Sequence, residues 1–239
     1  MSSTVLGNVI GVAGTAARTA VEAAVQIAAS RTGIDFGYLI AQARLESGLN
    51  PKAQSRSSSA AGLYQFTNAT WLETVRKHGA EHGLGWAANA LKDGAAALGH
   101  ETRTAILALR NDAQASALMA AEYAADNRDA LESRLGHAVG TTELYLAHFL
   151  GSSGAARFLK ANDSNAATSA AAVAPSAARS NRSIFFAADG RARSVGEVLQ
   201  RFADKLGTAS PTGRPDVAAV RYQLLGDAID IGGRDRKST

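Results

Sequence analysis

The most informative stretch of the chain is residues 37–72, GYLIAQARLESGLNPKAQSRSSSAAGLYQFTNATWL. Its first part predicts a helix over residues 34–47, because apolar residues recur at helical spacing on the face that carries Glu46. Gly48 and Pro51 follow, and both residues are typical of the end of a helix. We therefore expect Glu46 to lie in the last turn of this helix, on its buried side.

That position favours the protonated form of Glu46. Burial disfavours a charged carboxylate, and the negative end of the helix dipole disfavours it further. A carboxylic acid that keeps its proton towards neutral pH is what general acid catalysis requires. On position alone, an ordinary helix-end glutamate is the better explanation, so the case for catalysis depends on the residues that follow.

Several short motifs follow in a fixed order. They are Glu46-Ser47, Asn50-Pro51, the segment Ser59-Ala60-Ala61-Gly62-Leu63-Tyr64-Gln65-Phe66, and Thr70-Trp71. This order resembles the soluble lytic transglycosylase family of lysozyme-like enzymes, in which Glu-Ser closes a helix and a Gly-(small)-x-Gly-Leu-x-Gln segment lies downstream. The resemblance spans roughly residues 34–159 and is most specific over residues 46–71.

The resemblance implies a mainly α, lysozyme-like fold and an enzyme that cleaves the glycan strands of peptidoglycan. In this family one glutamate protonates the bond between N-acetylmuramic acid and N-acetylglucosamine. It then acts as a base on the muramyl C6 hydroxyl, which closes a 1,6-anhydro ring. Glu46 would take that catalytic role, and no cofactor is implied. The implied substrate-binding residues are Ser47, Gly62, Leu63, Tyr64, Gln65, Tyr145 and His148.

These binding residues come from two parts of the resemblance. Ser47 would orient the glutamate or a sugar acetamide, while Gln65 and the backbone of residues 62–64 would line the cleft. The family also carries an Ala-Tyr-Asn-x-Gly segment that contacts sugar, and its nearest match is Ala147-His148-Phe149-Leu150-Gly151. His-Phe replaces Tyr-Asn there, and Tyr145 is the aromatic residue that would substitute.

The sequence also favours a mechanism with a single carboxylate. Ordinary glycosidases use two carboxylates, yet no Asp or Glu occurs between Glu46 and Glu73. One carboxylate suffices where an internal hydroxyl replaces water as the nucleophile. Two alternatives stay open: a muramidase, in which Glu143 or another carboxylate activates water, and a glycan-binding or assembly protein whose working part is residues 181–239.

The composition excludes several other classes of protein. None of the 239 residues is a cysteine, which excludes a disulfide scaffold, a thiol nucleophile and cysteine-containing zinc sites. A net charge of only +4 argues against nucleic acid as a partner. His78 and His82 are four residues apart, but Gly79 stands where a zincin has glutamate, so no metal site is expected.

The chain divides into four parts by composition. We expect an N-terminal helical segment over residues 1–30, a lysozyme-like domain over 31–160, an Ala/Ser-rich linker over 161–180 and a C-terminal extension over 181–239. The predicted helices of the domain lie near residues 34–47, 68–79, 83–98, 103–110, 114–135 and 142–160, with a loop or small hairpin between the first two. The extension should hold a short strand, an Asp189-Gly190 turn, an amphipathic helix and a disordered tail.

The location of the protein follows from its expected substrate. No basic residue precedes Arg18, which is unlike a secretory signal, and no apolar run of about 18 residues predicts a membrane-spanning helix. Because peptidoglycan lies outside the cytoplasm, we expect the periplasm or cell envelope, reached by non-Sec export. This would link the enzyme to an envelope-spanning assembly, such as a secretion machine or a flagellum, with an assembly protein docking on residues 181–239. A phage role and a misassigned start that hides a signal are the alternatives.

Overall fold

The computed structural model describes residues 3–209, with side chains from residue 16 onward. Over these residues the mainly α prediction is confirmed, because no β-strand forms and only isolated β-bridges occur. The α-helices are α1 (Ser3–Thr32), α2 (Phe36–Ser47), α3 (Asn68–His78), α4 (Gly85–Ala90), α5 (His100–Ala108), α6 (Ala113–Leu135), α7 (Thr141–Ser164), α8 (Ala170–Val173), α9 (Pro175–Ser180), α10 (Arg182–Phe185) and α11 (Val195–Ala209). Three 3₁₀ turns join them, namely η1 (Gly79–His82), η2 (Ala95–Ala97) and η3 (Leu109–Asn111).

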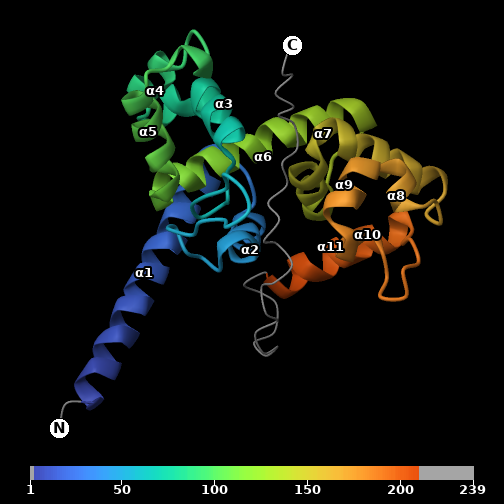
Figure 1. Cartoon of the computed structure of the whole chain (residues 1–239), viewed down its shortest axis with the longest axis horizontal. Helices are drawn as coiled ribbons and strands as arrows, with labels where there is room; N and C mark the ends of the chain where they lie inside the picture. The colour runs from blue at the N-terminus through green and yellow to red at the C-terminus, as the bar shows by residue number, and fades with distance from the viewer. Residues whose placement is uncertain (1–2, 210–239) are drawn as a thin grey trace.

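The helices form two groups that share α6 (Figure 1). The first group contains α3, α4 and α5, and the second contains α7 to α11, while α1 projects away from both. Helix α6 packs against α1 at one part of its length and against α7 at another. Helix α11 packs against both α7 and α2, so α2 is contacted by the second group as well as by α1.

Two predicted elements differ from the observed ones. The helix predicted near residues 83–98 ends at Ala90, and η2 follows only after Gly94, whose φ of 90° and ψ of 161° are incompatible with a helix. The strand predicted after residue 181 is a single helical turn, α10. The guanidinium of Arg193 donates to the carbonyl oxygens of Ser183, Ile184 and Phe186, which stabilises that turn instead.

Residues 161–180 contain regular structure of their own. The α7 segment is interrupted at Gly151, whose φ of 70° and ψ of 155° are not helical, and then continues to Ser164. Helices α8 and α9 follow after a short turn. Ala170 and Ala178 are buried against the core. Alanine is the best helix former and its small side chain permits close packing, so an alanine-rich composition serves a packed helical segment here.

Residues 181–209 share the core of the second group. The ring of Phe149 in α7 lies 6.3 Å from that of Phe185 in α10 and 5.0 Å from that of Phe202 in α11, measured between centroids. Both Phe185 and Phe202 are buried. The predicted amphipathic helix is α11, and its apolar residues Val195 and Val198 face inward as expected. The predicted disordered tail lies outside the described residues.

Helix α1 covers the predicted N-terminal helical segment. Its second half is buried along Val21, Val25 and Ala28, which lie on one face at helical spacing and pack towards α6. Among the described residues, no helix is both long enough and apolar enough to span a membrane.

Candidate active site

Glu46 lies in the last turn of α2, as the sequence predicts. The helix begins after Asp35, whose side chain accepts a hydrogen bond from the backbone N–H of Tyr38 at 2.7 Å. It ends at Gly48, which adopts a left-handed conformation with φ 63° and donates its N–H to the carbonyl of Arg44. The Glu46 side chain is 12% exposed. The carboxylate is therefore shielded from most solvent but still accessible.

His148 of α7 is the hydrogen-bonding partner of Glu46. Nε2 of His148 lies 3.2 Å from Oε1 of Glu46, and Nδ1 lies 3.1 Å from Nε2 of Gln42. When the amide nitrogen of Gln42 donates to Nδ1, Nε2 of His148 carries a proton and donates it to Glu46. Gln42 precedes Glu46 by one turn of α2 and is buried. Two residues of α2 thus hold the orientation of one imidazole.

Three tyrosines surround this pair. The Tyr145 ring stacks on His148 at 5.9 Å, and the Tyr123 ring meets it edge-on at 6.3 Å. Burial raises the pKa of Tyr145 well above its usual value, and the Glu46 carboxylate raises it further. Burial likewise raises the pKa of Tyr38, again with a contribution from Glu46. The phenols stay neutral and form an apolar wall around the carboxylate and the imidazole.

The loop of residues 48–67 is fastened to the end of α2 by Ser47. Its hydroxyl lies 2.7 Å from the carbonyl oxygen of Leu63, to which it donates. The backbone N–H of Asn50 donates to the same hydroxyl at 3.2 Å. The loop holds isolated bridges between residues 54, 61 and 66 but no strand, in line with the predicted loop or small hairpin. Ser47 therefore positions the loop beside Glu46.

Gly62 is where the loop touches the rest of the protein most closely. It adopts a φ of 83°, and a Cβ at this position would lie 2.0 Å from the carbonyl oxygen of Arg110. The Arg110 guanidinium donates back to the loop, to the carbonyls of Ser59 at 2.7 Å and Phe66 at 2.9 Å. Only glycine fits such a contact with a left-handed backbone. The Gly-Leu motif is thus explained by packing against η3.

The three residues after Gly62 serve the loop in different ways. Leu63 and Tyr64 are buried, so their side chains pack in the core and only their backbone groups are available to a ligand. Gln65 has a φ of 49° and donates its amide to the carbonyl of Gly62 at 2.9 Å. Its side chain is half-buried beside the loop backbone.

Residues 23–104 match the model of the transglycosylase SLT domain. The protein carries an SLT domain. This segment belongs to the lytic transglycosylase family of the lysozyme-like superfamily. It starts within α1 and ends within α5, earlier at both ends than residues 34–159, over which the sequence resembles the family.

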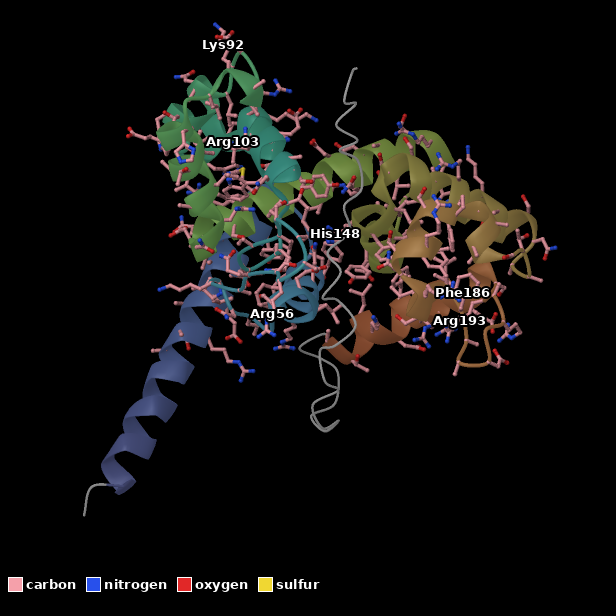
Figure 2. All side chains as sticks on the ribbon, viewed as in Figure 1. Arg56, Lys92, Arg103, His148, Phe186 and Arg193 are labelled. Atoms are coloured by element: carbon pink, nitrogen blue, oxygen red, sulfur yellow. The ribbon has the colours of Figure 1, made fainter. Side chains whose placement is uncertain are left out.

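The SLT match contains Glu46, Ser47 and the loop, but the rest of the surroundings of Glu46 lies beyond residue 104. His148 and Tyr145 come from α7 and Tyr123 from α6. Figure 2 shows His148 in the middle of the molecule, between the helices that carry Arg103 and those that carry Phe186. The SLT domain thus supplies the carboxylate, and later helices supply the groups that face it.

Helix α11 also reaches this region. Arg44 of α2 donates to the carbonyl oxygen of Ala209 at 2.8 Å, and the Phe202 ring meets Tyr145 edge-on at 5.5 Å. Burial and the nearby Arg201 lower the pKa of Lys205, whereas the Glu46 carboxylate acts in the opposite direction. Lys205 therefore lies within the electrostatic reach of Glu46.

Glu143, the candidate for a second carboxylate, has a different partner. It lies in the first turn of α7, where its side chain accepts a hydrogen bond from the backbone N–H of Gly140. Gly140 has no side chain, so this contact is the glutamate half of a capping box. This contact explains a glutamate at that position by helix capping alone. No hydrogen bond between Glu143 and the residues around Glu46 occurs in the described part of the chain.

Sequence reasoning missed several of these residues. Gln42 and Tyr38 lie in the quoted helix, and the same periodicity that placed Glu46 places Gln42 one turn before it. Tyr123 and Lys205 carry no such signal, because their positions depend on how α6 and α11 pack. Trp71 of the Thr70-Trp71 motif is fully buried and donates to the carbonyl of Ile106 at 2.8 Å, so it belongs to the core.

Proposed function

We propose that the protein is a peptidoglycan lytic transglycosylase that cleaves the bond between N-acetylmuramic acid and N-acetylglucosamine, with Glu46 as its catalytic acid and base. The observation that carries the proposal is a largely shielded glutamate at the end of α2, held by an imidazole, inside a transglycosylase SLT domain. The substrate class follows from the family, and the residue follows from the geometry.

The hydrogen bond from His148 gives the two carboxylate oxygens of Glu46 different roles. Oε1 accepts from the imidazole, which leaves Oε2 to carry the catalytic proton. In the first step Oε2–H protonates the glycosidic oxygen as the bond to the muramyl C1 breaks. In the second step the carboxylate takes the proton of the C6 hydroxyl while that oxygen bonds to C1. The imidazole tautomer is the same in both steps.

His148 acts here as a positioning residue. It keeps one oxygen of Glu46 occupied, and Gln42 and Tyr145 fix the ring through its Nδ1 and its face. A fixed geometry of this kind increases the reaction rate, because the acid is already oriented before the substrate reacts. Tyr145 is buried, so we assign it to the support of His148, whereas His148 itself is 22% exposed and within reach of a sugar.

Ser47, Gln65 and the backbone of residues 62–64 are proposed to form the side of the substrate site next to Glu46. Their mutual hydrogen bonds hold the loop in one conformation, which pre-organises its polar groups for sugar hydroxyls and acetamides. The proposal assigns Leu63 and Tyr64 backbone contacts only.

The matched pair of variants Glu46→Gln and Glu143→Gln tests the assignment. Glu46→Gln keeps the volume but cannot donate a proton as an acid, so cleavage of purified peptidoglycan should be abolished. Gln also serves in a capping box, so Glu143→Gln should fold and retain cleavage. Loss of activity in Glu143→Gln alone would favour the muramidase, and retained activity in Glu46→Gln would overturn the catalytic assignment.

We place the enzyme in the periplasm or cell envelope, where its substrate lies. Docking of an envelope-assembly protein on residues 181–239 remains part of the proposal. Residues 181–209 pack into the core, so deletion of residues 210–239 is the suitable test. Normal cleavage by the truncated protein together with lost localisation in cells would support docking, and unchanged localisation would contradict it.

A further inference from the structure

A second cluster of ionisable side chains lies between α3, η1 and α6. His78 is the last residue of α3, Glu81 and His82 belong to η1, and Glu122 and Asp126 are one turn apart in α6. Potential ligand atoms of His78, Glu81 and Glu122 all lie within 4.8 Å of one another. Two separate parts of the chain, residues 78–82 and α6, thus bring one imidazole and two carboxylates to one point.

The two nitrogens of His78 have different partners. Nε2 lies 3.1 Å from Oδ2 of Asp126, while Nδ1 lies 3.5 Å from Oε2 of Glu122. When Nε2–H donates to Asp126, Nδ1 turns a lone pair towards a carboxylate oxygen. An imidazole nitrogen and a carboxylate oxygen that face each other are held together either by a proton on the imidazole or by a metal ion between them. Two zinc ligands at ~2.0–2.2 Å in tetrahedral geometry are ~3.4 Å apart, close to the observed separation.

The groups around these ligand atoms support such a site. Nε2 of His82 lies 2.6 Å from Oε1 of Glu122, and the His82 side chain is only 6% exposed. This contact occupies Oε1 and leaves Oε2 directed to His78. Metal-binding histidines commonly donate their other N–H to a carboxylate, which is the position that Asp126 takes here. His78 and Glu122 are therefore each oriented by a further hydrogen bond.

We propose that His78, Glu81 and Glu122 bind a divalent transition-metal ion, with Zn²⁺ the best match. Imidazole nitrogen favours zinc and its neighbours over Mg²⁺ and Ca²⁺, which prefer oxygen ligands throughout. Water would complete the tetrahedron. The ion would join the end of α3 and η1 to α6, and so stabilise the packing of the first group of helices on α6. This inference does not depend on the proposed catalytic function.

The site was not expected from the sequence, because the sequence argument considered only His78 and His82 as a pair on one helix. The structure separates their roles, since α3 ends at His78 and His82 lies in η1. His78 faces two carboxylates of α6, and His82 supports one of them. The competing explanation is an ion-pair cluster in which His78 carries two protons and binds no metal.

Titration of the untagged, chelator-treated full-length protein with ZnCl₂ in a calorimeter tests the proposal. We expect saturable binding of one ion, an affinity lowered by at least about 100-fold in His78→Ala and Glu122→Gln, and a 10- to 100-fold loss in Asp126→Asn. His137→Ala, an exposed histidine outside the cluster, should bind as the wild type does. Saturating Zn²⁺ should raise the Tm of the wild type and leave that of His78→Ala unchanged.

Two further measurements keep the proposal testable if a variant of a partly buried residue fails to fold. Glu81 is exposed, so Glu81→Gln should fold normally and still weaken zinc binding. Co²⁺ bound to the wild type should give the intense visible absorption of a tetrahedral site. Absence of saturable Zn²⁺ binding, or equal affinity in the wild type, His78→Ala and Glu81→Gln, would overturn the proposal and leave the ion-pair cluster.

Discussion

Nε2 of His148 lies 3.2 Å from Oε1 of Glu46, although the two residues are 102 positions apart in sequence. Glu46 lies within the residues that match the SLT domain, whereas His148 lies beyond them. The carboxylate and the group that orients it therefore come from different parts of the chain, joined by the packing of α7 and α11 around α2.

This relationship predicts different effects for two substitutions of His148. His148→Phe keeps the ring but removes the donor, and we expect kcat to fall roughly 100-fold with a small change in KM, because misplacement of a catalytic group costs about that much. His148→Gln retains an N–H donor and should recover part of the loss. Steady-state kinetics on a soluble glycan substrate measure both. Equal activity of the Phe variant and the wild type would contradict the positioning role.

The contact between Gly62 and Arg110 predicts a large loss of stability in Gly62→Ala. The left-handed backbone costs roughly 1–2 kcal/mol for a residue with a Cβ, and the overlap with the Arg110 carbonyl should add about 1–3 kcal/mol. Gly83→Ala is the matched control, because Gly83 has a φ of 79° but nothing within 4 Å of its added Cβ. Urea unfolding of both variants measures the difference, and equal losses would refute the close contact.

The aromatic cluster predicts that α11 is needed for stability. Phe202→Ala removes a buried ring that contacts Tyr145 and Phe149, and should cost about 3–5 kcal/mol in the free energy of unfolding. Gln200→Ala, at an exposed position of the same helix, should change it by less than about 0.5 kcal/mol. Thermal unfolding compares the two. A small effect of Phe202→Ala would mean that α11 does not belong to the core.

The first turn of α11 predicts a pH dependence of stability. Hydrogen bonds from Arg191, and then from Ser194, lower the pKa of Glu197 to about 2. A carboxyl whose pKa is lowered by folding stabilises the protein above its unfolded value, near 4.5, and this contribution is lost as pH falls towards 2. The Tm difference between the wild type and Glu197→Gln should therefore be present at pH 6 and disappear near pH 2. A difference that persists at pH 2 would contradict this origin.

The sequence predicted the parts of the site that depend on local signals. Helical spacing together with Gly48 placed Glu46 correctly, and the Gly-Leu motif correctly indicated a structured loop. The sequence predicts substrate binding for Tyr64 and Tyr145, whereas both side chains are buried in the structure. Burial of an aromatic residue depends on which helices cover it. Tyr64 packs in the core and Tyr145 supports His148, and no local pattern separates these outcomes from sugar contact. The role of Phe202 depends in the same way on the docking of α11.

The central claim is that Glu46 works twice on the glycan and that no water is added. Digestion of purified peptidoglycan in H₂¹⁸O, followed by mass spectrometry of the soluble muropeptides, tests it most directly. We predict muramyl ends one water lighter than hydrolysis products, without ¹⁸O, and no fragments from Glu46→Gln. Reducing muramyl ends that carry one ¹⁸O would contradict the claim and show hydrolysis by a second catalytic group.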